Sequence, residues 1–169
     1  LNILAAMAAK KVRKIVFSST AAVYAPSEKS AIDETDLLAP LSPYGATKVM
    51  AEELIKSIGS AEGLSTISLR YFNVVGSTKV EFADNSKDNL VPKVFAAIKR
   101  GESPEIYGSD YPTKDGTCIR DYIHVADLAD SHLSALQRVE SAIVHEVYNV
   151  GSGKGYSVKE MIDQISVSM

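Results

Sequence analysis

Two short apolar runs, rich in β-branched and aromatic residues, constrain the fold more than any other feature of this sequence. They are residues 14–18 (KIVFS) and 65–72 (STISLRYF), and each follows a helical stretch, residues 1–11 and 42–58. Short apolar runs between helices are typical of buried parallel strands, because helices cover both faces of a parallel sheet. The order helix, strand, helix, strand therefore predicts right-handed crossovers and a doubly wound α/β layer.

The second half of the chain has a more mixed pattern. Residues 77–89 are polar and predict a long loop. The pattern after this loop predicts helices over residues 90–100, over 126–139 and from 158, and short strands over 105–107, 118–125 and 146–150. We therefore expect a smaller mixed α/β region in addition to the parallel layer.

Composition excludes several classes of protein. The 169 residues are 46% hydrophobic and 23% charged, with a net charge of -3 and no basic block, so we expect no nucleic-acid partner. Cys118 is the single cysteine, which excludes an internal disulfide and a cysteine-based zinc site, and the histidines lack metal-ligand spacing. Without a signal-peptide pattern or an apolar run of about 20 residues, we expect a cytoplasmic protein and no membrane partner. Neither end shows a helix cap, which predicts a segment of a longer protein.

The motif SPYGATK at residues 42–48 suggests chemistry. Ser42 is a suitable N-cap and Pro43 suits a first helical turn, which places Tyr44 and Lys48 one turn apart on the same helix face. A nearby ammonium stabilises the phenolate form of a tyrosine, which can then act as a general acid or base near neutral pH. This spacing alone is close to chance, but a run of hydroxyls, residues 18–20 (SST), ends the first strand, where open α/β sheets bind ligands.

Longer motifs carry a family resemblance. SSTAAVY, SPYGATK and LRYFNVVG resemble the extended short-chain dehydrogenase/reductases, whose active site combines Ser or Thr, Tyr and Lys. DNLVP, EIYGSDYPTKDGTCIRDYIHVADLADSH and YNVGSGKGYSV resemble, within that superfamily, the UDP-glucose 4-epimerase family. The resemblance covers essentially the whole chain.

The resemblance implies a reaction and a cofactor. It implies NAD-dependent interconversion of UDP-glucose and UDP-galactose, with hydride transfer at the sugar C4 through a 4-keto intermediate. Tyr44 would exchange a proton with the 4-hydroxyl, and Lys48 would tune Tyr44 and bind the nicotinamide ribose. Thr20 would supply the strand-end hydroxyl, with Ser18 or Ser19 as the alternatives if the register shifts. Phe72 would lie beside the nicotinamide, so the cofactor residues would be Thr20, Tyr44, Lys48 and Phe72.

The resemblance also assigns residues to a UDP-sugar substrate: Asn73, Asn89, Leu90, Glu105, Ile106, Tyr107 and Arg120. Asn73 and Arg120 would contact the diphosphate, and residues 105–107 would form a strand beside the uracil. Asn89 and Leu90 would act at a helix start, where free backbone N–H groups suit a phosphate. Taken from the residues alone, a salt bridge between Arg120 and Asp121 is an equal alternative.

The resemblance divides the chain into two parts and predicts its assembly. Residues 1–73 would form the C-terminal part of a NAD-binding Rossmann domain. Residues 74–169 would mainly bind the nucleotide sugar, with elements returning to the Rossmann sheet. The helices at residues 1–11 and from Pro43 would contribute to a homodimer. GSGKG at residues 151–155 lacks the spacing of a phosphate loop and predicts a turn.

Three alternatives remain. The first is a 4-epimerase for another UDP-sugar. The second is a catalytically inactive fragment, because no GxxGxxG phosphate loop precedes Lys14. The third, a nucleotide-sugar 4,6-dehydratase, is disfavoured because Ala21 and Ala22 stand where that family supplies an acid.

Overall fold

The chain forms two compact units in a computed structural model that describes residues 1–27 and 29–168. Unit 1 comprises Leu1–Phe72 and Asp127–Val150, and unit 2 comprises Asn73–Ala126 and Gly151–Met169. Glu28 and Met169 lie outside the described residues. The boundary between the units therefore falls after Phe72, and a later segment returns to unit 1.

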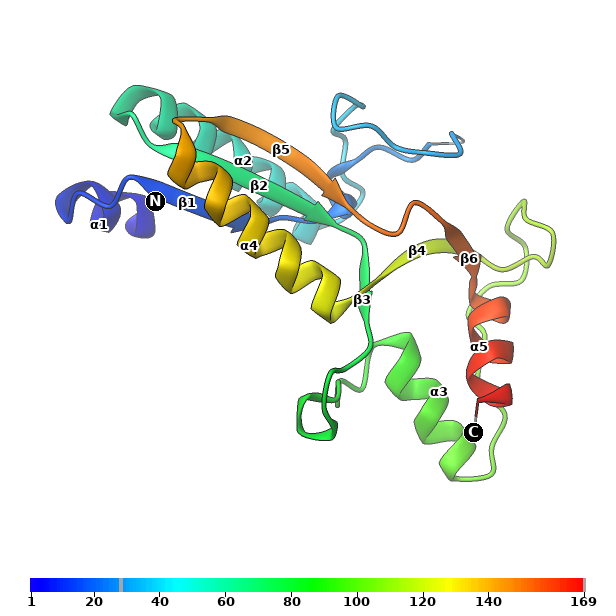
Figure 1. The fold of residues 1–169 in the computed structure, drawn as a ribbon. Coiled ribbons are helices and arrows are strands. Elements are labelled where there is room, and N and C mark those ends of the chain that lie inside the picture. The colour runs from blue at the N-terminus through cyan, green and yellow to red at the C-terminus, as the bar shows by residue number, and fades with distance from the viewer. Residues whose placement is uncertain (28, 169) are drawn as a thin grey trace. The chain divides into compact units, whose positions relative to one another are not determined.

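Unit 1 is a three-stranded parallel sheet with the strand order β1-β2-β5. Helices α2 and α4 lie on opposite faces of this sheet (Figure 1). The fold is thus the predicted doubly wound, Rossmann-type α/β layer. Its elements are α1 (Asn2–Ala9), β1 (Lys14–Ser18), the 3-10 helix η1 (Ala21–Val23), α2 (Pro43–Glu62), β2 (Ser65–Tyr71), α4 (Val125–Ser141) and β5 (His145–Val150).

Strand alternation sorts the side chains of unit 1 onto the two faces of the sheet. Leu4 of α1, Ile55 of α2 and Leu64 form a buried cluster, and Ile15 and Phe17 of β1 pack against it. Successive side chains of a strand point to opposite faces, so Ser19 points to the same face as Phe17 and Ser18 to the other. Neighbouring residues at the end of β1 therefore meet different helices.

Unit 2 contains a small mixed sheet with the order β3-β4-β6, in which β3 and β4 are parallel and β4 and β6 antiparallel. Val94 of α3 and Ile162 and Ile165 of α5 form its buried apolar cluster. The elements are β3 (Asn73–Val75), the 3-10 helix η2 (Val80–Phe82), α3 (Leu90–Lys99), β4 (Ile119–His124), β6 (Gly155–Ser157) and α5 (Val158–Val167).

The structure differs from the predictions made from the sequence at three points. Residues 105–107 are not a strand, because the described residues give them no partner in a ladder. α2 continues past Gly59 and ends at Glu62, with Gly63 as a left-handed cap at φ 66°. The strands β3 and β6 were not predicted, because three residues carry too little periodicity.

No helix within residues 1–27 and 29–168 is both long enough and apolar enough to cross a membrane.

Candidate active site

Tyr44 and Lys48 lie in the first turns of α2, and the predicted cap holds this helix start. The Ser42 hydroxyl accepts a hydrogen bond from the Gly45 amide at 3.1 Å, and Pro43 occupies the first turn. Tyr44 is 53% exposed, whereas Lys48 is half-buried. The tyrosine ring is thus accessible, and the lysine one turn later is partly enclosed.

Gly45 lets the start of α2 approach the loop that follows β1. A Cβ atom at Gly45 would lie 2.3 Å from the backbone oxygen of Ala22 and 2.7 Å from Cβ of Pro40. Both neighbours are too close for any side chain, and the nearer one is backbone. The glycine of SPYGATK therefore brings the helix that carries Tyr44 into contact with η1, which begins just after Thr20. The sequence pattern alone did not predict this role of Gly45.

The three hydroxyls at the end of β1 have different partners. The Ser18 hydroxyl bonds Nε2 of His132 at 3.0 Å. Ser19 is fully buried and donates to the Glu52 carboxylate. The Thr20 hydroxyl accepts a bond from the Ala22 amide at 3.2 Å, which leaves its own hydrogen available for a further acceptor.

The Lys48 ammonium is held at the carboxyl end of β1. Its Nζ donates to the Ser18 carbonyl oxygen at 2.8 Å. The same atom lies 4.9 Å from the centroid of the Phe17 ring and 5.6 Å from that of the Tyr44 ring. An ammonium has three donors, so the bond to Ser18 leaves two hydrogens to bind another molecule. An ammonium within about 6 Å of an aromatic centroid is in the range of a cation–π contact, so Lys48 lies close to the ring of Tyr44.

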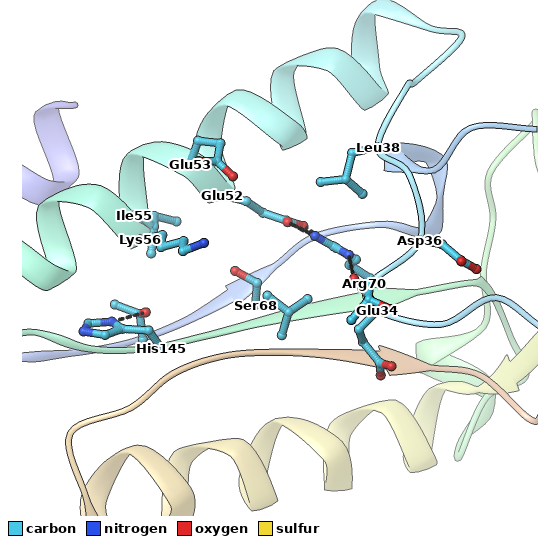
Figure 2. A pocket seen from close by; sticks show the side chains of 13 residues that line it. Glu34, Asp36, Leu38, Glu52, Glu53, Ile55, Lys56, Ser68, Arg70 and His145 are labelled. Carbon is cyan, nitrogen blue, oxygen red and sulfur yellow. Dashed lines mark hydrogen bonds and ion pairs between the residues drawn. The ribbon is translucent and has the colours of Figure 1, made fainter.

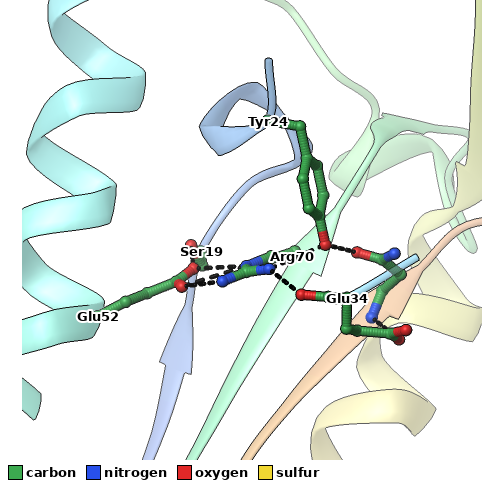
Figure 3. A network of polar contacts seen from close by, with 6 residues as sticks. Ser19, Tyr24, Glu34, Glu52 and Arg70 are labelled. Atoms are coloured by element: carbon green, nitrogen blue, oxygen red, sulfur yellow. Dashed lines mark hydrogen bonds and ion pairs between the residues drawn. The ribbon is translucent and has the colours of Figure 1, made fainter. Parts of the chain in front are cut away.

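A buried polar network supports this end of the sheet (Figure 3). Arg70 of β2 and Glu52 of α2 form an ion pair at 2.6 Å, with side chains only 5% and 6% exposed. Arg70 Nη1 also donates to the Tyr24 hydroxyl at 2.9 Å. Tyr24 in turn donates to the Asn149 side chain of β5 at 2.6 Å. One network thus joins α2, β2, β5 and the loop after β1.

Burial and hydrogen bonding together determine the pKa values of Arg70 and Tyr24 in this network. Burial opposes the charge of Arg70, but hydrogen bonds and Coulombic attraction from Glu52 and Tyr24 outweigh it and raise the guanidinium pKa. Burial raises the pKa of Tyr24, although Arg70 partly counteracts this effect. Tyr24 is therefore neutral and links Arg70 to Asn149. A lone arginine within a buried strand was the sequence signal for the network, since a buried charge needs a partner.

A polar cavity of about 280 Å³ lies along the Arg70–Glu52 pair in unit 1 (Figure 2). Thr66 and Ser68 of β2, His145 of β5 and Lys56 of α2 contribute to its walls. Thr20, Tyr44 and Lys48 do not line it. The cavity is therefore separate from the predicted proton-transfer residues.

Phe72, Asn73 and Arg120 each donate a hydrogen bond to a backbone carbonyl. Phe72 is half-buried, and its amide donates to the Val150 carbonyl at 3.2 Å. In unit 2 Asn73 is exposed, and its side chain donates to the Asp121 carbonyl at 3.1 Å. The Arg120 guanidinium bonds only its neighbour, the Ile119 carbonyl, at 2.9 Å among the described residues.

The contacts of Asp121 bear on two features considered from the sequence, a salt bridge between Arg120 and Asp121 and a phosphate loop at residues 151–155. The Asp121 carboxylate accepts bonds from the Ser152 amide at 2.8 Å and the Gly153 amide at 2.9 Å. It forms no ion pair with Arg120 within the described part of the chain. The amides of GSGKG that could hold a phosphate are thus bonded to a carboxylate, in agreement with the predicted turn.

The predicted residues at the start of α3 and after it lie at the surface or near it. Asn89 is the N-cap of α3, but its side chain donates to Asp84 at 2.7 Å and leaves the helix without a side-chain cap. Leu90 packs against the α3–α5 cluster. Glu105 and Ile106 are exposed, and Tyr107 donates to the Glu105 carboxylate at 2.8 Å. The predicted phosphate contact at Asn89 and Leu90 requires free backbone amides, and the start of α3 has no side-chain cap.

The parallel sheet, the helices on both of its faces and the Tyr–Lys pair at its carboxyl edge define a Rossmann-type scaffold of the short-chain dehydrogenase/reductase class. Residues 1–151 match the NAD dependent epimerase/dehydratase family. The chain therefore belongs to this family.

Similar proteins have been described as epimerases of UDP-sugars. A UDP-glucose 4-epimerase of Streptomyces lividans is 42% identical over 165 residues, covering 96% of this chain and 50% of that protein. A putative UDP-arabinose 4-epimerase of Arabidopsis thaliana is 40% identical over 171 residues, covering 96% and 39%. The crystal structure of UDP-glucose 4-epimerase from Brucella ovis in complex with NAD aligns with a TM-score of 0.87 at 35% identity, covering 98% and 52%. The chain spans about half the length of the curated relatives it matches.

Proposed function

We propose that this chain carries the proton-transfer residues of a NAD-dependent 4-epimerase that interconverts UDP-glucose and UDP-galactose. The observation that carries the proposal is the position of Lys48, whose ammonium is held by the Ser18 carbonyl and lies over the Tyr44 ring. Family membership and similarity to UDP-glucose 4-epimerases support the choice of reaction.

The residues at the carboxyl end of β1 fit the nicotinamide–ribose end of NAD. Lys48 has two hydrogens left for ribose hydroxyls, and Phe72 offers a half-buried apolar ring for the nicotinamide. NAD, when bound, supplies the acceptor and then the donor of the hydride at the sugar C4. The Gly-rich loop that would hold the pyrophosphate is not in this sequence, so the fit concerns this end of the cofactor only.

The chain's own residues would move the proton. As phenolate, Tyr44 takes the proton from the sugar 4-hydroxyl, and the O4–H bonding electrons form the carbonyl of a 4-keto sugar as the hydride leaves C4. Lys48 stabilises the phenolate before this step, and the Thr20 hydroxyl donates a hydrogen bond to O4. After the keto sugar turns over, Tyr44 returns the proton to O4 when the hydride reaches the opposite face.

The choice of Thr20 over its neighbours rests on hydrogen-bond partners. The Ser18 and Ser19 hydroxyls are engaged with His132 and Glu52, whereas the Thr20 hydrogen is available. The same contacts count against dehydration, because Glu52 near the strand end is already paired with Arg70 and cannot serve as a free acid.

The exposed residues of unit 2 are proposed to bind the UDP portion of the substrate. The Arg120 guanidinium matches the geometry of a diphosphate, and Asn73 would contact the same group. Asn89 and Leu90 would offer the uncapped amides of α3, and Glu105, Ile106 and Tyr107 would flank the uracil.

Exposed apolar residues on α1 and α2, among them Ile3 and Met50, support the proposal of a homodimer through these helices.

A second candidate is a 4-epimerase for another UDP-sugar, such as UDP-arabinose. This candidate is supported by a putative UDP-arabinose 4-epimerase that is 40% identical to this chain, close to the 42% of the UDP-glucose 4-epimerase of Streptomyces lividans. A panel of UDP-hexoses, UDP-pentoses and UDP-acetamido sugars would separate the two by their kcat/KM values.

The test of the proposed function measures bound NAD and UDP-galactose turnover. The assay uses this chain and the natural full-length protein that contains these residues. We expect epimerisation by the full-length protein, and its absence with every sugar of the panel would overturn the proposal. Turnover by the 169-residue chain alone would exclude the inactive-fragment alternative.

A further inference from the structure

His132 of α4 meets the end of β1 from the face opposite to α2. Its Nε2 atom lies 3.0 Å from the Ser18 hydroxyl, although 114 residues separate the two in the chain. Both residues are half-buried members of unit 1. The imidazole also packs against Tyr71 at the end of β2, with ring centroids 6.4 Å apart. His132 thus contacts the ends of two adjacent strands.

The other ring nitrogen of His132 fixes the roles in this bond. Nδ1 lies 2.9 Å from the Leu128 carbonyl oxygen, one helical turn earlier in α4. A carbonyl can only accept, so Nδ1 carries a hydrogen. In the neutral imidazole Nε2 is then the acceptor, and the Ser18 hydroxyl must donate to it. The geometry therefore selects one tautomer and one orientation of the serine hydroxyl.

Ser18 connects this contact to the proposed site. The residue whose side chain bonds His132 presents its backbone carbonyl to the Lys48 ammonium at 2.8 Å. The bond from the Ser19 amide to the Leu69 carbonyl at 2.8 Å holds the plane of the Ser18–Ser19 peptide, and the bond between the Ser18 side chain and His132 is a second restraint on the same residue. Ser18 therefore joins α4 to α2, because its side chain bonds His132 and its backbone carbonyl bonds Lys48.

We propose that His132 is a positioning residue for Lys48, acting through Ser18. This inference rests on the proposed function, in which Lys48 tunes Tyr44 and binds the nicotinamide ribose. His132 does not touch the reacting atoms in this role. It keeps the Ser18 carbonyl, and with it the ammonium, in the place that proton transfer at Tyr44 requires.

Four variants separate positioning from a merely structural role. His132→Phe keeps a ring against Tyr71 and removes both hydrogen bonds. His132→Gln keeps an amide that can accept from Ser18. Ser18→Ala removes the hydroxyl and keeps the carbonyl, and the fourth variant combines Ser18→Ala with His132→Phe. Circular dichroism checks the fold of each, and if His132→Phe does not fold, Ser18→Ala and His132→Gln carry the test.

The first readout needs no activity. The acylation rate of Lys48 in the 169-residue chain is compared by mass spectrometry with that of Lys56, an exposed lysine of the same helix. We expect Ser18→Ala and His132→Phe each to raise the Lys48 rate about two- to tenfold, the range of one net hydrogen bond. His132→Gln and the rate at Lys56 should remain near wild type. The double variant should exceed neither single variant, because both remove the same link.

The second readout is turnover by the natural full-length protein. We expect kcat to fall about two- to tenfold in His132→Phe, with KM for the UDP-sugar unchanged and recovery in His132→Gln. Unchanged Lys48 acylation, or additive effects of the two single variants, would overturn the positioning role. If the wild-type protein has no epimerase activity, the proposed function fails, and the acylation data still decide whether His132 holds Lys48.

Discussion

Lys48 in unit 1 and Arg120 in unit 2 are both cations with proposed roles at a ligand, but the fold holds them in different ways. The Lys48 ammonium is bonded to a strand carbonyl next to a buried network that joins α2, β2 and β5. The Arg120 side chain lies at the surface, and its one hydrogen bond among the described residues is to its neighbour in sequence.

This contrast indicates where the chain is preorganised. Catalytic groups must be held closely, and buried second contacts provide this support in unit 1. Recognition of a charged, flexible nucleotide can use exposed side chains, because much of their ordering can occur on binding. We therefore expect substitutions around the unit 1 site to change stability and rate, and substitutions at the unit 2 residues to change affinity.

Removal of Arg70 should have the largest effect on stability. Arg70→Met leaves the Glu52 carboxylate buried without its partner, and we expect a loss of about 3–5 kcal/mol in the free energy of unfolding, measured in urea. Combining Arg70→Met with Glu52→Met removes the uncompensated charge and should recover most of this loss. A loss below about 1 kcal/mol in the single variant would show that the network does not support unit 1.

Gly45→Ala tests the contact between α2 and the loop after Thr20. Helix propensity alone predicts stabilisation by about 0.5–1 kcal/mol. The clash with the Ala22 backbone predicts the opposite, a loss of about 1–3 kcal/mol together with slower turnover. Ser57→Ala, at an exposed position of the same helix, is the control and should stay within about 0.5 kcal/mol. Stabilisation by Gly45→Ala would contradict the proposed packing role.

Arg120→Met should separate affinity from stability. Because Arg120 is exposed, we expect its removal to change the free energy of unfolding by less than about 0.5 kcal/mol. Loss of a charged hydrogen bond to the diphosphate should raise KM for the UDP-sugar about tenfold. A stability loss as large as that of Gly45→Ala, with KM unchanged, would remove the contrast between the two units.

The smallest expected effect concerns pH and the start of α5. Hydrogen bonds from the Ser157 hydroxyl, the Thr117 amide and the Thr117 hydroxyl lower the pKa of Asp115 below its usual 3.8. Because the pKa of Asp115 is lower in the folded state, the ionised carboxylate stabilises the fold at pH values above its ordinary pKa. This contribution is lost as the pH falls through the lower pKa of the folded state. The Thr117 amide signal in NMR should follow this titration in the wild type and lose it in Asp115→Asn. A titration midpoint of Asp115 above the usual pKa of 3.8 would mean that ionisation of this carboxyl group destabilises the fold, which would contradict the prediction.

Local signals explain the part of the structure that the sequence predicted. Ser42 and Pro43 define the start of α2, and the run KIVFS has the bounds of β1. The predicted helix stops at residue 58, before Gly59, but α2 runs through this glycine, whose missing side chain serves packing: a Cβ atom there would lie only 2.8 Å from Cγ2 of Thr66. The left-handed Gly63 is the true end of α2.

The interactions that hold the site join residues far apart in the sequence, so the hydrophobic periodicity of a single element cannot predict them. Ser18 and His132 lie 114 residues apart, and Glu52 and Arg70 lie 18 apart on different elements. The strand predicted at residues 105–107 failed for a related reason, because a strand requires a partner that the run itself cannot specify. The family resemblance predicted roles for the site residues, and the structure shows the contacts that these residues make.

The most direct test of the account is Tyr44→Phe in the natural full-length protein. The change removes only the phenolic hydroxyl of a 53% exposed residue, so the fold should be retained, and bound NAD is measured alongside turnover. We expect kcat for UDP-galactose epimerisation to fall about 10²- to 10⁴-fold, the range of general acid–base catalysis. Turnover near the wild-type rate, by a variant with normal stability and bound NAD, would contradict the central role of the Tyr44–Lys48 pair.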